Sequence, residues 1–218
     1  MKKYGLYEHA GKVPYQQWKD DGIAVPIFDK DGTLSHANRL DFVDEVIDEL
    51  AVAQLADIYA KIAIASNNHD HTQVEAFAEA LRKKLGIGVL AVSRAEGYRS
   101  KPHPDMGLVI AREFGVAPSG VGVIGDRLFT DVKFGRNIGA GAIALCAKAG
   151  DGDARWVPKL RVIERGMTAI DKARGAATHY APPIDQPADE GEVRPPAIGE
   201  KLFDAIERAL NAKRDNKE

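Results

Sequence analysis

The sequence predicts an α/β fold with one parallel β-sheet that helices cover on both faces. Two observations lead to this class. Five short apolar segments alternate with helical patterns between residues 22 and 146, and such alternation is typical of right-handed βαβ units. The apolar segments are hydrophobic nearly throughout, which favours strands buried on both faces of the sheet.

Each expected element has a local pattern behind it. The helix expected over 40–57 places Leu40, Val43, Val46, Ile47 and Leu50 on one face. The helix expected over 71–86 ends in a basic turn before Gly86. Two further helices are expected at 103–116 and 130–139. The expected strands are 22–28, 61–66, 89–93, 120–126 and 142–146.

The chain divides into three predicted parts. Residues 1–22 are expected to be an irregular N-terminal lead-in, residues 23–150 a catalytic domain, and residues 151–218 a C-terminal extension. Within the extension we expect a basic amphipathic helix at 156–174, an extended segment rich in proline and acidic residues at 180–199, and a terminal helix at 200–215.

The composition of the chain argues against several classes of function. The formal net charge of −2 over 218 residues argues against a general nucleic-acid binder, whose surface would be basic. Cys146 is the only cysteine, which excludes an internal disulfide and indicates a reducing compartment. No apolar run approaches the length of a membrane span. We expect a cytoplasmic protein and leave open peripheral contact with the inner face of the membrane. No feature of the sequence predicts its oligomeric state.

Polar residues that can carry chemistry follow the expected strands. In "VPIFDKDGTLSH" a strand ends in Asp29 and Asp31, Ser66 ends another, and Asp126 a third. Lys101 and Asp131 lie in loops at the same edge. Because ligands bind beyond the carboxyl ends of parallel strands, these groups are expected to form one site.

The residue types indicate phosphoryl transfer. Asp29, Asp31 and Asp126 are hard oxygen donors suited to Mg²⁺, which would relieve their mutual repulsion. Asp29 can attack phosphorus and form an aspartyl-phosphate, and Asp31 can serve as general acid and base. Ser66 and adjacent backbone N–H groups, with Asn67, are expected to hold phosphoryl oxygens, and Lys101 to neutralise charge. Asp131 is a further candidate metal ligand; as an alternative it caps the following helix.

Four segments in order resemble the motifs of haloacid dehalogenase-like (HAD) phosphatases. "FDKDGTL" resembles the first motif, "IAIASNN" the second, "SKPHPDM" the third and "IGDRLFTD" the fourth. The resemblance implies a Rossmann-like fold with Asp29 as nucleophile and Asp31 as acid/base. It also implies that Asp31 binds the metal through its backbone carbonyl, and that Asp131 is a ligand directly or through water.

Two details suggest the branch of this superfamily. The intervals 29–66 and 66–101, where caps are inserted in the superfamily, are each filled by one predicted helix and its connections, so no large cap is expected. The lysine between the aspartates, "SNN", and "GDRLFTDV" followed by Asn137 are similar to the phosphatidylglycerophosphate phosphatases of phospholipid metabolism. That resemblance implies a phosphate monoester substrate carried by a lipid.

Two other functions stay open at this point. One is a phosphatase of soluble sugar or nucleotide phosphates. The other is a non-catalytic interaction protein on a HAD scaffold, which the presence of Asp29 and Asp31 disfavours. The histidines His69 and His71 are interpreted as loop residues beside the site, because no further ligands complete a zinc site. The cations expected to meet phosphates around the third motif are Arg94, Arg99, Lys101 and His103.

Overall fold

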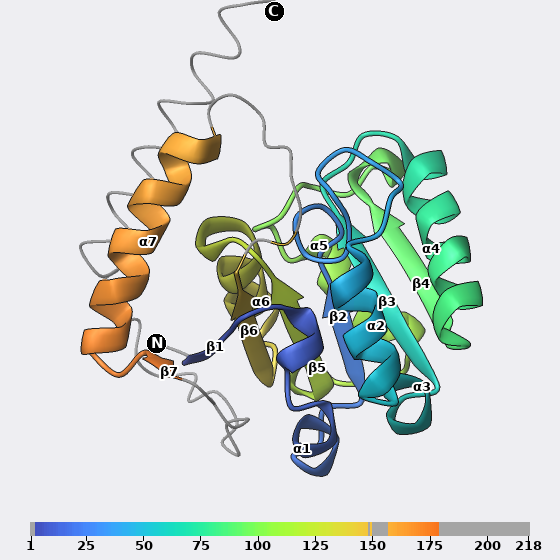
Figure 1. The fold of residues 1–218 in the computed structure, drawn as a ribbon, viewed down its shortest axis with the longest axis horizontal. Coiled ribbons are helices and arrows are strands. Elements are labelled where there is room, and N and C mark those ends of the chain that lie inside the picture. Colours follow the sequence, from blue (N-terminus) through green and yellow to red (C-terminus); the bar gives the residue numbers. More distant parts are fainter. Residues whose placement is uncertain (1–2, 148, 150–156, 179–218) are drawn as a thin grey trace, which may run out of the picture. The chain divides into compact units, whose positions relative to one another are not determined.

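Seven strands form one sheet with the order β4-β3-β2-β5-β6-β1-β7, and every neighbouring pair is parallel (Figure 1). The computed structural model describes residues 3–147, 149 and 157–178. In chain order the strands are Tyr4–Tyr7 (β1), Val25–Phe28 (β2), Lys61–Ser66 (β3), Gly88–Ser93 (β4), Val121–Gly125 (β5), Ala142–Cys146 (β6) and Ala177–Thr178 (β7).

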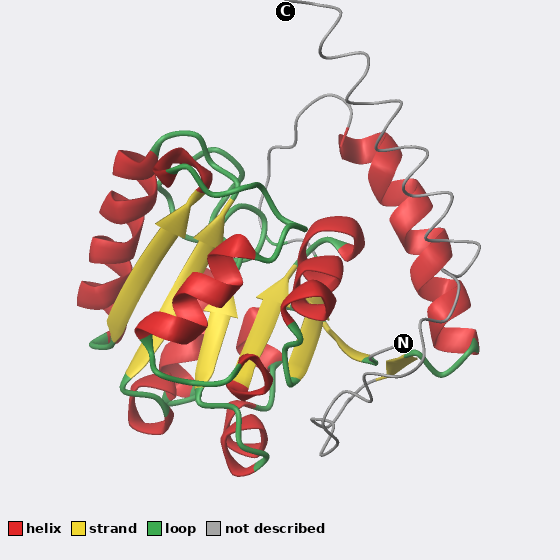
Figure 2. Cartoon of the chain, turned by 180° about the vertical axis from the view of Figure 1, so that it is seen from behind, coloured by secondary structure: helices red, strands yellow, loops and turns green. Residues whose placement is uncertain are grey.

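Helices cover both faces of this sheet (Figures 1 and 2). One face carries α2 and α4, with α1 and α3 beside them, and the other carries α5 and α6. The helices are Tyr15–Asp20 (α1), Asp44–Val52 (α2), Leu55–Ile58 (α3), His71–Leu85 (α4), Asp105–Glu113 (α5), Lys133–Ile138 (α6) and Val157–Ala173 (α7). The predicted fold class is therefore confirmed.

The middle of the sheet is the most deeply buried part of the fold. All four residues of β2 and all five of β5 are buried. Trp18 of α1 packs directly over Gly122 of β5, where a Cβ atom would lie 2.4 Å from the indole ring. A side chain at that position would therefore displace the helix. The carboxyl ends of the two strands are held side by side by their pairing, which joins Phe28 to Ile124.

The expectation of an irregular N-terminal lead-in is wrong. Residues 4–7 form β1, which pairs with β6 on one side and β7 on the other, and residues 15–20 form α1. The segment "YGLY" is short, and its main partner is about 140 residues away in the sequence. Strand propensity depends on such cross-strand packing, so a local pattern carries little signal there.

The single helix predicted over 40–57 is observed as two shorter helices, α2 and α3. The observed helix α2 begins at Asp44 and ends at Val52, and Gln54 adopts a left-handed conformation (φ 52°) before α3. Leu40, which was expected on the buried face, lies in the preceding loop and is 48% exposed. Val46, Ile47 and Leu50 do face the core.

The predicted helix over 156–174 is observed as α7, and the chain then returns to add β7 to the sheet. The expected boundary at residue 150 remains a prediction. The segments 180–199 and 200–215 lie outside the described residues. Among the described helices, none combines the length and apolar character that crossing a bilayer requires.

Candidate active site

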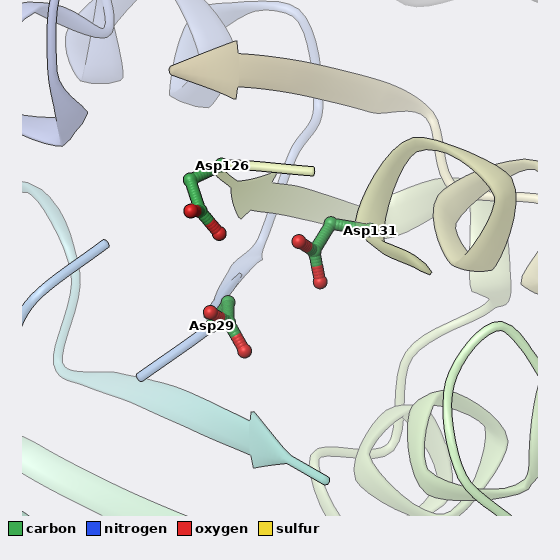
Figure 3. Close-up of side chains that lie close together, drawn as sticks. All are labelled: Asp29, Asp126 and Asp131. Carbon is green, nitrogen blue, oxygen red and sulfur yellow. The ribbon is translucent and has the colours of Figure 1, made fainter. Parts of the chain in front are cut away.

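Three neighbouring strands deliver polar residues to one edge of the sheet. Asp29 follows β2, Ser66 ends β3 and Asp126 follows β5, and these strands are adjacent in the order β3-β2-β5. Asp131 lies in a π-helical turn, Leu128–Val132, that leads into α6. The side chains of Asp29, Asp126 and Asp131 point toward one another (Figure 3).

The three aspartates form a carboxylate cluster. One oxygen from each lies within 4.8 Å of the others. Glycine makes this possible at Gly32, which has φ +86° and where a Cβ atom would lie 2.6 Å from Asp126 Oδ2. A side chain there would be strained and would collide with the carboxylate. The first-motif turn can therefore approach the fourth motif only because it contains glycine.

Lys101 links two members of the cluster. Its buried Nζ donates to Asp29 Oδ1 at 2.5 Å and to Asp131 Oδ1 at 2.7 Å. Three carboxylates thus gather in a nearly buried position, and Lys101 bonds to two of them. Hard carboxylate oxygens that converge in this way suit a divalent cation such as Mg²⁺. The donor set therefore fits the predicted metal.

The charges of the cluster shift the protonation of its members. Burial, together with the Asp131, Asp126 and Asp31 carboxylates, raises the pKa of Asp29 to about 8, although Lys101 opposes the shift. Burial disfavours the charged form of Lys101, but Asp131 and Asp29 outweigh this and raise the pKa of its ammonium. A proton or a cation is thus favoured beside Asp29, while Lys101 stays charged.

Asp31 stands apart from the carboxylate cluster. Its Oδ1 accepts from Lys30 Nζ at 2.7 Å and from the Asn38 backbone N–H at 2.8 Å. Lys30 has no exposed surface, and its Nζ also donates to the Arg39 carbonyl at 2.8 Å. These hydrogen bonds fix the orientation of the Asp31 carboxyl group and use its Oδ1 atom as the acceptor. Its contacts are thus with Lys30 and the Asn38 backbone, and not with the cluster.

The second motif supports the third. The Asn67 side chain accepts from the Lys101 backbone N–H at 2.7 Å and donates to the Lys101 carbonyl at 3.1 Å. Ser66 is buried, and its Oγ accepts from the Asn68 backbone N–H at 3.2 Å. Asn67 therefore holds Lys101 in place, a role the sequence did not suggest. Its expected contact with substrate remains a prediction, as does that of Ser66.

A cavity of about 210 Å³ opens over these groups. Its lining includes Asp29, Asp31, Asn67 and Lys101, which the sequence predicted, and His69, which was interpreted as a loop residue beside the site. The other lining residues are Asn38, Asn68, Arg127 and Thr130. Lys30, hidden beneath Asp31, was missed as a site residue. A lysine between two acids could have suggested an ion pair, but lysine is so rarely buried that its position was not predictable.

Neither of the two intervals where a cap was considered, both of them described by the structure, contains a cap domain. The interval 29–66, all of it described, holds only α2 and α3. The interval 66–101 holds α4, β4 and a short 3-10 turn. The prediction of an uncapped site is confirmed. A parallel α/β sheet with this ordered set of strand-end residues and no cap defines an uncapped phosphatase of the HAD superfamily.

A family model described as "Mitochondrial PGP phosphatase" matches residues 9–148, which are nearly two thirds of the chain. The chain belongs to this family and is a phosphatase. No curated protein matches the chain.

Several solved structures are similar over part of the chain. A protein from Lactobacillus delbrueckii subsp. bulgaricus, provisionally named a phosphoglycolate phosphatase, is 28% identical over 45% of this chain and 39% of its own, with a TM-score of 0.38. A HAD-superfamily hydrolase from Geobacter sulfurreducens is 15% identical over 64% and 96%, with a TM-score of 0.43. A HAD family hydrolase from Deinococcus radiodurans with bound phosphate and sodium is 16% identical over 71% and 98%, with a TM-score of 0.42. The assignment rests on the family match and not on these similarities.

Proposed function

We propose that this protein removes the terminal phosphate of phosphatidylglycerophosphate in a Mg²⁺-dependent reaction through an aspartyl-phosphate. The observation that carries the mechanism is the carboxylate cluster of Asp29, Asp126 and Asp131, in which Lys101 Nζ lies 2.5 Å from Asp29 Oδ1 and 2.7 Å from Asp131 Oδ1. The family match supports the substrate.

The first half-reaction begins at Asp29. Its Oδ1 is held by Lys101, which leaves Oδ2 to attack the phosphorus atom. As the new P–O bond forms, the ester P–O bond breaks and its electron pair goes to the leaving oxygen. Asp31 donates a proton from its Oδ2 atom to the leaving oxygen, because its Oδ1 atom already accepts from Lys30 and Asn38. The products are the alcohol and an aspartyl-phosphate.

The second half-reaction releases phosphate. Asp31, now ionised, takes a proton from a water molecule, and the resulting hydroxide displaces Asp29 from phosphorus. The acyl-phosphate P–O bond breaks, Asp29 becomes a carboxylate again, and inorganic phosphate leaves. The Lys101 ammonium offsets negative charge at the reacting group in both steps.

A metal ion would be held by the Asp29, Asp126 and Asp131 carboxylates. We expect Asp31 to contribute its backbone carbonyl. Bound Mg²⁺ supplies charge neutralisation and orients the phosphoryl oxygens.

The size of the cavity favours a substrate that remains largely outside it. A volume of about 210 Å³ admits a phosphate and part of a glycerol, but is smaller than the pockets that enclose a whole drug-sized ligand. With no cap to close over the site, acyl chains can stay outside, in a micelle or a bilayer. Peripheral contact with a membrane is part of this proposal.

The test is phosphate release by the purified protein with Mg²⁺. Phosphatidylglycerophosphate in mixed micelles is compared with soluble sugar and nucleotide phosphates, and Asp29→Asn serves as the blank. We expect the lipid to have the highest kcat/KM. Preference for a soluble ester would discard the lipid assignment and keep the chemistry. Turnover by Asp29→Asn equal to that of the wild type would contradict the mechanism.

A further inference from the structure

Cations around the third motif differ in whether a carboxylate neutralises them. Lys101 lies between Asp29 and Asp131. Arg99 makes a double contact with Asp105, at 2.9 and 3.1 Å. Arg94 is different, because no carboxylate of the described residues lies within ion-pair distance of it.

Within the described part of the chain, the Arg94 guanidinium makes one hydrogen bond, and its partner is a histidine. Arg94 Nη1 lies 3.1 Å from His69 Nε2. A guanidinium has only donors, so Nε2 must accept, which places the His69 proton on Nδ1. His69 in turn lines the cavity that contains Asp29 and Lys101. A half-buried positive charge that no described carboxylate neutralises therefore lies at the rim of the catalytic cavity.

The backbone that carries Arg94 is firmly held. Arg94 opens a 3-10 turn, Arg94–Glu96, with a capping box in which the Ser93 backbone N–H donates to Glu96 Oε2 at 2.8 Å. His71 Nδ1 lies 3.0 Å from the buried Ser93 Oγ and 3.3 Å from Glu96 Oε2. These bonds occupy Glu96, the nearest acid in the sequence, so it does not neutralise Arg94.

We infer that Arg94 and His69 form a second anion subsite, which binds a further phosphate on the substrate beyond the one that is removed. An arginine guanidinium offers several N–H groups in a plane that matches phosphate oxygens. Phosphatidylglycerophosphate carries a phosphodiester three carbons from its terminal phosphate. The inference rests on the proposed function and deepens it, because it assigns the selection of two-phosphate substrates to named residues.

Three substrates distinguish the effect of a second phosphate from the effect of the acyl chains. Glycerol 1-phosphate has one phosphate, glycerol 1,3-bisphosphate has two and no lipid, and short-chain phosphatidylglycerophosphate has two and acyl chains. We expect wild-type kcat/KM to be higher for both two-phosphate substrates. Arg94→Gln should lower those two values about tenfold, the effect of losing one charge-assisted hydrogen bond. The value for glycerol 1-phosphate should not change, which also shows that the variant is folded.

Arg99→Gln is the matched control. It removes the same charge from the same loop, but from an arginine that Asp105 already neutralises, so the preference for two phosphates should persist. Equal losses on all three substrates in Arg94→Gln would overturn the subsite, since they would indicate a role in holding the loop. A wild-type protein that hydrolyses all three equally well would overturn it too.

Binding to Asp29→Asn distinguishes failure of the subsite from failure of the proposed function. Calorimetric titration with glycerol 1,3-bisphosphate should give tighter binding than with glycerol 1-phosphate, and Arg94→Gln in the same background should remove the difference. That result supports the subsite even if no substrate is turned over. Equal binding of the two compounds would overturn it even if the lipid phosphatase activity is found.

Discussion

Lys30 carries a charge but has no exposed surface, and its ammonium is used entirely inside the site. Its three contacts are Asp31 Oδ1, the Arg39 carbonyl and the face of the Phe77 ring, whose centroid lies 5.3 Å away. A buried ammonium requires such compensation. Lys30 is therefore a positioning residue that ties the acid/base candidate Asp31 to the loop that follows it.

Lys30→Met should reduce kcat/KM, which reports the steps up to formation of the aspartyl-phosphate, in a way that depends on the leaving group. Methionine keeps the apolar stem but releases Asp31, and misplacement of a catalytic group by about 1 Å can cost about 100-fold. We expect a loss of this size with an alkyl phosphate. With p-nitrophenyl phosphate the loss should be smaller than about tenfold, because its good leaving group hardly needs a proton. Steady-state kinetics with both substrates measures the difference.

The exposed Lys61 supplies the control for this variant. Lys61→Met removes a lysine of the same sheet without touching the site, and both activities should be retained. Equal losses of kcat/KM on the two substrates in Lys30→Met would contradict the positioning role, because they would indicate damage to the fold as a whole.

The carboxylate cluster predicts how pH and metal affect stability. In the metal-free protein the pKa of Asp29 is raised from 3.8 to about 8. Between these values the unfolded chain binds fewer protons at this group than the folded chain, so the contribution of Asp29 to stability falls as pH rises through that window. We expect Mg²⁺ to raise the melting temperature more at about pH 8 than at about pH 5.

Thermal unfolding with and without Mg²⁺ at both pH values tests this prediction. Asp29→Asn is the control, since its amide does not titrate and its shift with Mg²⁺ should be smaller and less dependent on pH. A larger stabilisation by Mg²⁺ at the lower pH would contradict the expected sign.

At the scale of elements, α7 supports the fourth motif. Glu164 is buried, and its Oε1 accepts from the Phe129 backbone N–H at 3.1 Å, within the turn that carries Asp131. It also lies 3.9 Å from Arg127 Nε. Helix α7 thus stabilises a turn of the candidate site, although the match to the family model ends at residue 148.

Glu164→Ala should destabilise the protein by about 1–3 kcal/mol, the cost of leaving a buried backbone N–H without a partner. We also expect a lower kcat, because the turn that positions Asp131 would loosen. Urea unfolding and phosphatase kinetics measure the two effects. Arg165→Ala changes an exposed neighbour on the same helix and should leave both quantities unchanged. An unchanged free energy of unfolding for Glu164→Ala would contradict the role of α7.

At the scale of the whole molecule, the N-terminus and α7 meet at the edge of the sheet. Tyr4 Oη donates to Asp171 Oδ2 at 3.1 Å, and β1 pairs with β7. A chain that ends after Ile184 keeps all these contacts and serves as the reference. A chain that ends after Ala149 loses them, and its melting temperature should fall roughly 2–4 °C for each kcal/mol lost. Equal melting temperatures for the two truncated chains would contradict this account.

The sequence by itself determined the elements whose signals are local. Strands at 61–66 and 142–146 were predicted with their observed bounds, because apolar runs between turn residues need no distant partner to be recognised. The order of the motifs likewise placed Asp29, Asp31, Ser66, Lys101 and Asp126 at one edge of the sheet. The parallel direction of these strands follows from the length of the crossovers between them.

Only the tertiary structure decided the relations between residues far apart in the chain. It brought Asp131 into the carboxylate cluster, buried Lys30 under Asp31, and joined Asn67 to the Lys101 backbone. It also made strands of β1 and β7, whose pairing partners lie far along the sequence. Such contacts depend on packing between distant segments, so no local pattern specifies them.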